Sequence, residues 1–238
     1  MRLPTNALSF KRLLLRWYRR QARDLPWRTT RDAYAIVVSE FMLQQTQVSR
    51  VLEYFPRFLR RYPTVHHLSR ATPRQVRESW EGLGYYRRAE NLHRLAKTIV
   101  REHEGEIPDD PERLRDLPGV GRYTAGAVAA FAYERRVAAV DTNVARVLTR
   151  VFGLRLPKGA RREHRLWALA SALLPKRRRA VWEFNQALMD LGATVCRARG
   201  PLCSTCPVRT ACRTGRRLTS SGGSARARRR GRGSTPKR

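Results

Sequence analysis

All four cysteines of this 238-residue chain fall within one short stretch near its end. They are Cys196, Cys203, Cys206 and Cys212, with the spacing C-x6-C-x2-C-x5-C. The N-terminus has neither the apolar core nor the cleavage site of a secretory signal, so we expect an intracellular chain with reduced thiols. Four thiolates suit zinc or a [4Fe–4S] cluster. Zinc ribbons usually carry two C-x2-C pairs, so the single pair favours the cluster, with zinc and a structural disulfide as alternatives.

Two carboxylates have surroundings that suit catalysis. Glu40 has apolar neighbours on both sides within residues 36–43. If this segment packs inward, desolvation should raise the pKa of Glu40, which suits a general acid. The alternative is a Glu on the exposed face of an amphipathic helix. Asp141 follows the apolar run 137–140 and should begin the next helix as its N-cap, a role compatible with a catalytic one.

A glycine turn lies between two predicted helices, residues 111–116 and 123–133. It is Leu117-Pro118-Gly119-Val120-Gly121. Two glycines allow a tight turn that directs backbone N–H groups outward from the start of the next helix, which is a phosphate-binding arrangement. Many glycine turns merely connect helices. Beside the basic charge and the cysteines, this turn favours a helix-hairpin-helix element.

The charge of the chain indicates a polyanionic partner. Lys and Arg number 50 against 19 Asp and Glu, the formal net charge is +31 and the pI is about 11.6. Nucleic acid is the expected partner of such a chain, and no apolar run is long enough to span a membrane. Residues 213–238 form a predicted disordered tail with ten basic residues and no acidic one. Without that tail the formal net charge falls from +31 to +21.

The elements that must position these residues are helices. Apolar residues recur at helical spacing in most segments, and no pair of period-2 strands is present, so the sequence predicts an all-α fold. Thr72, Pro73 and Gln75 predict an N-cap, a proline at the first helical position and a capping box.

Seven motifs in order resemble the adenine DNA glycosylase (MutY) branch of the helix-hairpin-helix base-excision superfamily, over about residues 8–212. Besides the cysteine loop, they lie at residues 25–28, 39–48, 82–86, 117–126, 141–144 and 184–192. The resemblance implies a six-helix barrel domain at 28–138 that includes the helix-hairpin-helix. It also implies a second helical domain, 1–27 and 139–212, with a [4Fe–4S] cluster loop at 196–212. The DNA and an extruded base would lie between the two domains.

The resemblance also assigns roles. Glu40 would protonate the departing adenine and Asp141 would stabilise the positive charge on the sugar, as the two carboxylates do in glycoside cleavage. Tyr123 and Asn143 would support the site. The residues implied to line the base pocket are Trp27, Arg28 and Gln186. The residues implied to contact DNA are Gln45, Thr46, Tyr85, Gly119, Gly121, Arg197 and Arg199. Of these, Gln45 and Tyr85 would wedge into the base stack, although Tyr85 could instead be a core aromatic. The sequence Tyr85-Tyr86-Arg87-Arg88 has the polar surroundings of a groove-reading surface.

The implied protein is a monofunctional enzyme of base excision repair that hydrolyses the glycosidic bond of adenine opposite guanine or 8-oxoguanine. Its partner would be double-stranded DNA with mispaired adenine, and we expect a cytoplasmic, nucleoid-associated monomer. Endonuclease III-like relatives carry a Schiff-base lysine where this chain has Tyr123. Full-length relatives continue into a C-terminal domain that inspects 8-oxoguanine, and here we expect a basic tail in its place.

Two other functions remain open. A mismatch thymine or uracil glycosylase uses the same scaffold, but Glu40 argues against it because a pyrimidine leaving group does not need an acid. A non-catalytic iron–sulfur DNA-binding protein needs neither Glu40 nor Asp141.

Overall fold

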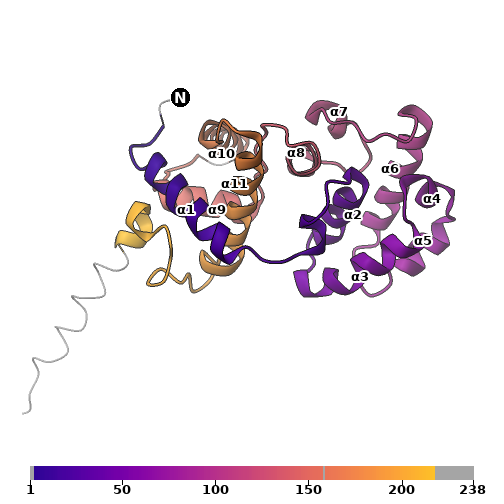
Figure 1. Ribbon diagram of the computed structural model, residues 1–238, viewed down its shortest axis with the longest axis horizontal. Coiled ribbons are helices and arrows are strands. Elements are labelled where there is room, and N and C mark those ends of the chain that lie inside the picture. The colour runs from indigo at the N-terminus through magenta and orange to yellow at the C-terminus, as the bar shows by residue number, and fades with distance from the viewer. Residues whose placement is uncertain (1–2, 158, 218–238) are drawn as a thin grey trace, which may run out of the picture. The chain divides into compact units, whose positions relative to one another are not determined.

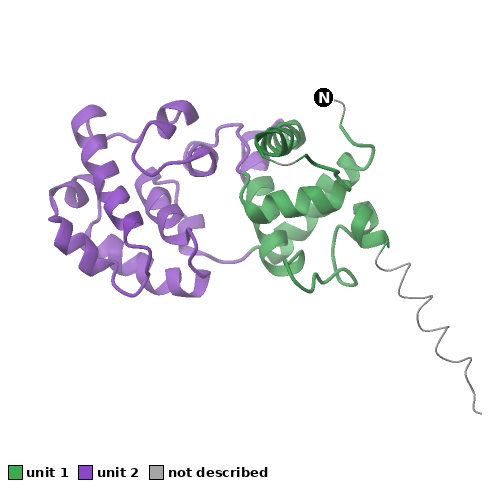
Figure 2. Cartoon of the chain, turned by 180° about the vertical axis from the view of Figure 1, so that it is seen from behind, with its two compact units in different colours: residues 1–22, 140–175, 183–238 green, residues 23–139, 176–182 purple. Residues whose placement is uncertain are grey.

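The computed structural model describes residues 3–157 and 159–217, and within these ranges it contains helices and no strand. The predicted all-α class is therefore confirmed. The chain forms two compact units (Figures 1 and 2): unit 1 is residues 1–22, 140–175 and 183–238, and unit 2 is residues 23–139 and 176–182. The domain boundaries expected from the sequence, near 28 and 139, stay predictions.

Unit 2 is built around one central helix. Its elements are η1 (Pro26–Arg28), α2 (Ala33–Leu43), α3 (Val48–Arg61), α4 (Val65–Arg70), α5 (Pro73–Ser79), α6 (Arg87–Glu102), α7 (Pro111–Arg115) and α8 (Arg122–Phe131). Helix α2 packs against η1, α3, α6 and α8, whereas α4 and α5 pack on α6 and α7 packs on α8. Every residue of α2 from Tyr34 to Met42 is buried. A helix that is apolar on all sides belongs in the interior, and this one starts where the Asp32 carboxylate accepts the Tyr34 N–H at 2.8 Å.

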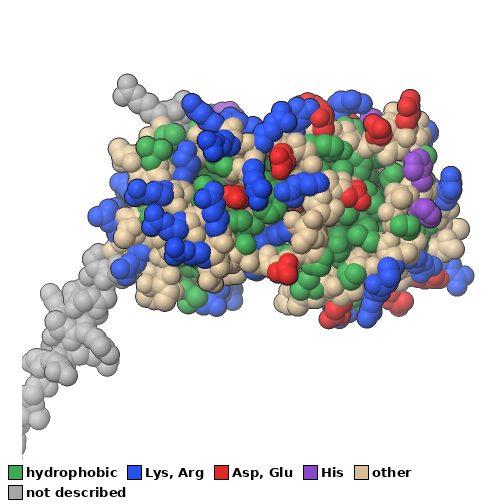
Figure 3. Space-filling view, in the orientation of Figure 1, with side chains coloured by type: hydrophobic (Ala, Val, Ile, Leu, Met, Phe, Trp, Pro, Cys, Tyr) green, Lys and Arg blue, Asp and Glu red, His purple; other side chains and the backbone are tan. Residues whose placement is uncertain are grey.

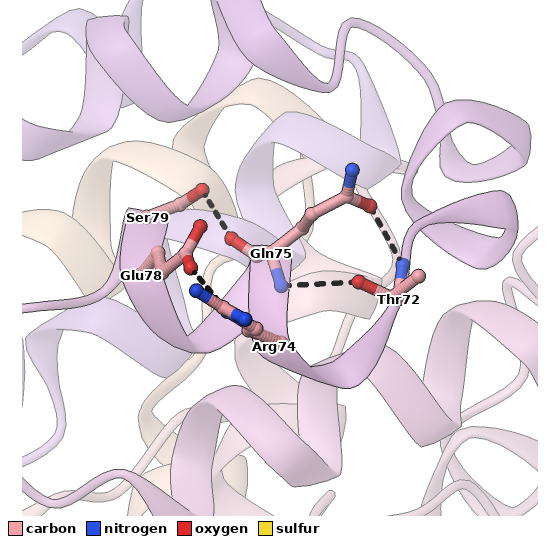
Figure 4. Close-up of polar contacts among 5 residues, drawn as sticks. All are labelled: Thr72, Arg74, Gln75, Glu78 and Ser79. Atoms are coloured by element: carbon pink, nitrogen blue, oxygen red, sulfur yellow. Dashed lines mark hydrogen bonds and ion pairs between the residues drawn. The ribbon is translucent and has the colours of Figure 1, made fainter.

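Helix α5 begins with the predicted capping box, drawn in Figure 4. The Gln75 N–H donates to Thr72 Oγ1 at 3.2 Å, and the Thr72 N–H donates to Gln75 Oε1 at 2.9 Å. Pro73 occupies the first helical position. The Ser79 hydroxyl donates back to the Gln75 carbonyl at 2.8 Å, and Arg74 pairs with Glu78 at 2.9 Å. The sequence prediction for this helix start is confirmed.

Unit 1 holds the cysteines. Its elements are α1 (Ala7–Gln21), α9 (Thr142–Phe152), α10 (Ala160–Leu173), α11 (Arg178–Asp190), the π-helical turn η2 (Leu191–Val195) and η3 (Arg209–Ala211). The first residues of α11, up to 182, belong to unit 2. Helix α9 packs against α10 and η2, and α1 packs against η3. Phe10 anchors this core through edge-to-face contacts with Phe152, at 5.4 Å between ring centres, and with Phe184, at 6.5 Å.

Unit 1 is strongly basic. Its acidic residues are Asp141, Glu163, Glu183 and Asp190, against a large number of Lys and Arg. Glu183 pairs with Arg19 at 2.9 Å. In Figure 3, Lys and Arg side chains crowd the left part of the face in view, where few Asp and Glu are seen.

The chain continues as a helical turn beyond the last cysteine. Residues 213–217, which the sequence placed in the disordered tail, are helical, and the Thr214 hydroxyl donates to the Arg150 carbonyl at 2.7 Å. The rest of the predicted tail, 218–238, lies outside the described residues. Among the helices that are described, none has the length and apolar character needed to cross a membrane.

Replacing Thr72 by Ala should lower the free energy of unfolding by about 1 kcal/mol, because the first turn of α5 loses its side-chain cap. Denaturant titration followed by circular dichroism measures this change. Ser69→Ala is the matched control, since the Ser69 hydroxyl bonds the His66 carbonyl and caps no helix start. Equal effects of the two substitutions would contradict the capping argument.

Candidate active site and metal centre

Glu40 lies in the last turns of α2 and is 5% exposed. The helix around it is buried on all sides, which excludes the alternative of a Glu on an exposed face. A carboxyl group in this position is shielded from water, and the packed helix holds it in place. The proposed role as a proton donor is compatible with this setting and stays a prediction.

Three further predicted site residues belong to unit 2. Trp27 is buried in η1 and packs edge-on against Phe55, at 5.5 Å between ring centres. Arg28 follows it and donates to the Arg23 carbonyl at 3.3 Å. Tyr123 is half-buried in the first turn of α8. Trp27 therefore has a clear packing role, and the base-pocket roles of Trp27 and Arg28 stay predictions.

The glycine turn joins α7 to α8 as expected. Gly119 has φ +76°, and a Cβ there would lie 2.7 Å from the Asn91 Cβ and 3.0 Å from the Phe41 ring. Only glycine meets both demands without strain. Gly121 is the exposed N-cap of α8 and has no side chain to satisfy the first N–H groups of the helix. The turn therefore presents the helix N-terminus that phosphate binding requires.

The two predicted wedge residues occupy separate turns of unit 2. Gln45 and Tyr85 both have left-handed backbones, with φ 56° and 48°. Gln45 is exposed and Tyr85 is 59% exposed, so the alternative of a core aromatic at Tyr85 is wrong. Thr46 is half-buried. Arg88, expected in the polar surroundings of a groove reader, is buried instead, because its guanidinium binds backbone carbonyls.

In unit 1, Asp141 is the N-cap of α9. Its Oδ1 accepts the Val144 N–H at 2.7 Å, and its Oδ2 accepts the Asn143 side-chain amide at 2.8 Å. One carboxylate oxygen thus begins the helix while the other is oriented by a side chain. Asn143 thus orients one oxygen of Asp141, and the catalytic role that the resemblance implies for the two residues stays a prediction.

Sequence reasoning missed that α9 is bonded to the cysteine loop. Arg146 donates from Nη2 to the Asn143 Oδ1 at 2.7 Å and to the Gly192 carbonyl at 2.8 Å, and from Nε to the Cys196 carbonyl at 2.9 Å. A Cβ on Gly192 would lie 2.7 Å from the Asn143 Cβ. Arginines at i+3 and i+7 from Asn143, on the helix that begins at Asp141, were the signal that could have revealed this link.

All four cysteines line one cavity of about 180 Å³, together with apolar residues and the segment after Cys212. Burial raises the pKa of the Cys206 thiol to about 11 and also raises the pKa of Cys212. The Gly215 N–H donates to the Cys212 Sγ at 3.2 Å. Four thiols around one cavity fit a [4Fe–4S] cluster, in which each iron takes one cysteine.

Among residues 3–157 and 159–217 no group of three or more His, Cys, Asp or Glu is arranged to hold a metal ion, so the cluster stays a proposal. Arg150 secures the loop that starts at Cys196, because its Nη1 lies 3.5 Å from the Cys196 Sγ and donates to the Arg197 carbonyl at 2.7 Å. Arg197 and Arg199 are exposed on that loop.

Gln186, predicted in the base pocket, is buried in α11.

Comparison with known proteins gives consistent matches. Residues 38–171 match the HhH-GPD family, described as HhH-GPD superfamily base excision DNA repair protein. An adenine DNA glycosylase of Rattus norvegicus is 45% identical over 220 residues, covering 88% of this chain and 42% of the relative. One of Mycobacterium tuberculosis is 52% identical over 196 residues, covering 82% of this chain and 64% of the relative. The chain thus spans less than two thirds of these curated relatives.

A solved thermostable thymine-DNA glycosylase has a TM-score of 0.81 and is 30% identical to this chain. The match covers 89% of this chain and 97% of that one. The helical arrangement described above is therefore shared with a glycosylase named for a pyrimidine base.

Gly192→Ala should destabilise the chain by about 1–3 kcal/mol, because the added methyl group overpacks η2 against Asn143. Thermal or denaturant unfolding measures this effect. Ala193→Ser, on the exposed neighbouring position, is the control and should be nearly neutral. A neutral Gly192→Ala would show that the close approach is not required.

Proposed function

Because the chain belongs to the HhH-GPD superfamily of base excision DNA repair proteins, we propose that it is a monofunctional glycosylase that removes adenine mispaired with guanine or 8-oxoguanine. The observation that carries the proposal is the burial of Glu40 in an otherwise apolar helix. The adenine DNA glycosylases that share 45% and 52% identity with the chain support the choice of base.

Breaking a glycosidic bond to adenine needs help at both ends of the bond. A carboxyl group shielded from water can deliver a proton to the departing base, which is the role proposed for Glu40. A fixed carboxylate can stabilise the developing positive charge on the sugar, and Asp141 is oriented for this by Val144 and Asn143. Tyr123 offers no amine for a covalent sugar adduct, so we propose hydrolysis without strand cleavage.

Binding of DNA is proposed for three features. The exposed start of α8 at Gly121 would bind a phosphate, and Arg197 and Arg199 would add charge from the cysteine loop. Gln45 and Tyr85, both exposed, would enter the base stack, with Thr46 beside them. A monomer associated with the nucleoid in the cytoplasm is proposed with them.

We also propose that the four cysteines hold a [4Fe–4S] cluster, whose chemistry here would be structural. The protein would supply one thiolate per iron from the cavity that all four cysteines line. Binding of the cluster would require the thiols to lose their protons. This includes Cys206, whose pKa burial raises to about 11.

A mismatch thymine or uracil glycosylase is the second candidate. The structural match to a thymine-DNA glycosylase favours it, because that match covers 97% of the other chain. Glu40 opposes it, since a pyrimidine can leave as an anion without a buried acid. A non-catalytic iron–sulfur DNA-binding protein would need neither Glu40 nor the orientation of Asp141.

Base release decides among these functions. Duplexes that hold A, T or U opposite guanine or 8-oxoguanine are incubated with excess protein, with and without alkali. We expect adenine release from both mispairs and strand breaks only after alkali. Release of thymine or uracil without adenine would establish the second candidate, and no release at all the non-catalytic one.

Glu40→Gln should slow adenine release by about 100-fold or more, because the amide keeps the shape and loses the acidic proton. Single-turnover kinetics measure the chemical step, and gel-shift titration should show duplex affinity close to wild type. Glu53→Gln, on the exposed face of α3, is the matched control. A Glu40→Gln rate within about tenfold of wild type, or about 1.4 kcal/mol of barrier, would exclude the acid role.

Truncation should separate the cluster from the tail. A chain ending at 217 should keep about four irons and its visible absorbance, whereas one ending at 212 should lose both, because Thr214 and Gly215 contact Arg150 and Cys212. Stoichiometric zinc in place of iron would refute the cluster.

Removing residues 218–238 should weaken binding to all duplexes. It should also lower the slope of log K against log[salt] by about 0.9 per lost phosphate contact.

A further inference from the structure

Among the described residues, four non-glycine residues of unit 2 have left-handed backbones, Gln45, Tyr85, Glu104 and Glu134, and two of them are the predicted wedge residues. Gln45 and Tyr85 lie at φ 56° and 48°, the left-handed region in which glycine is the usual residue. Such conformations persist where the surroundings over-determine them, and they are concentrated at ligand-binding sites. Both side chains are exposed, so packing of these side chains in the core does not explain the conformations.

One buried side chain binds the first turn. Arg88, at the start of α6, is 7% exposed, and its Nη1 donates to the carbonyls of Phe41 and Met42 at 2.9 and 2.8 Å. The same nitrogen bonds the Gln44 carbonyl, and Nη2 donates to the Thr46 hydroxyl at 3.0 Å. The residues on both sides of Gln45 are therefore attached to one guanidinium group.

The same guanidinium binds the second turn. Its Nη2 donates to the Leu83 and Gly84 carbonyls at 3.3 and 3.1 Å. Its carbon atom lies 5.5 Å from the ring centres of Tyr85 and Trp80, and the Trp80 N–H adds a bond to the Gly84 carbonyl at 3.3 Å. Arg88 thus joins the backbone that precedes Tyr85 to the backbone on both sides of Gln45.

We propose that Arg88 is a positioning residue that sets the separation of the two turns, so that Gln45 and Tyr85 enter the DNA stack together. This inference rests on the proposed function. A planar guanidinium with several N–H donors can serve both turns at once, whereas a lysine ammonium at the same place would reach fewer acceptors. Arg88→Lys therefore keeps the charge and removes the bridge.

The test uses the full chain and a duplex with an abasic-site analogue and 2-aminopurine on the opposite strand. Wild-type protein should raise the 2-aminopurine fluorescence, because the wedge unstacks that base. Arg88→Lys should lower this signal and lose about tenfold or more of the preference for the abasic duplex over an undamaged one. Arg50→Lys is the matched control, since Arg50 binds the Gly82 carbonyl of the second turn and does not bridge to the first.

Circular dichroism establishes that each variant is folded. A folded Arg88→Lys with the fluorescence and preference of wild type would overturn the proposal. If that variant does not fold, Thr46→Val decides. It removes the bond from Arg88 Nη2 to the first turn and only replaces a hydroxyl by a methyl group. Because Thr46 is itself a proposed DNA contact, affinity for the undamaged duplex is measured as well. A reduced signal from Thr46→Val with unchanged affinity for that duplex would support the bridge. A wild-type signal, or a reduced signal with weaker binding to that duplex, would count against it.

The proposed function has a separate outcome. Failure of the wild-type protein to unstack 2-aminopurine would reject the wedge and the role of Arg88, whereas the proposed function is rejected only if the same protein releases no adenine. A wild-type response that Arg88→Lys shares would reject the role of Arg88 alone.

Discussion

The burial of one carboxyl group inside an apolar helix is the constraint on which unit 2 depends. Glu40 cannot be moved toward water without withdrawing α2, whose other residues from Tyr34 to Met42 form the core. The helix is secured at both ends: Asp32 caps its first turn, and Arg88 binds the carbonyls of its last. A positive charge near a helix C-terminus is also stabilised by the partial negative charge of the helix dipole at that end. Arg88, which holds the end of the helix that bears the acid, thus also holds the turn that follows it.

In unit 1, a short chain of hydrogen bonds holds the second carboxylate, Asp141, in place. Asp141 is oriented by Asn143, Asn143 is held by Arg146, and Arg146 binds the backbone of the cysteine loop at Cys196. These bonds require η2 to approach α9 closely, which Gly192 permits by having no Cβ. A displacement of the cysteine loop would therefore change the acceptors available to Arg146 and, through it, the orientation of the Asn143 amide.

The sequence was informative where one residue type decides the local structure. Helical periodicity gave the all-α class, and Thr72 and Gln75 gave a capping box that the structure contains. The apolar neighbours of Glu40 left a buried and an exposed position open, and the burial of α2 on all sides decides for the buried one. Arg88 was misplaced because a guanidinium beside tyrosines resembles a DNA-binding surface until its remote carbonyl partners, 44 to 47 residues away, are known. The helical turn at 213–217 was missed because its partner Arg150 is also remote in sequence.

The position of the acid also bears on which base can leave. A departing pyrimidine spreads negative charge over its carbonyl groups, so a site that binds it gains little from a carboxyl group and pays for burying one. The adenine anion is a poorer leaving group, so adenine departs faster when it is protonated in the transition state. A buried carboxyl group near the end of α2 therefore fits the proposed adenine reaction, in which the leaving base takes up a proton, better than a reaction in which it does not. The shared helical scaffold carries no such preference, since packing of α2 against α3, α6 and α8 needs only apolar residues.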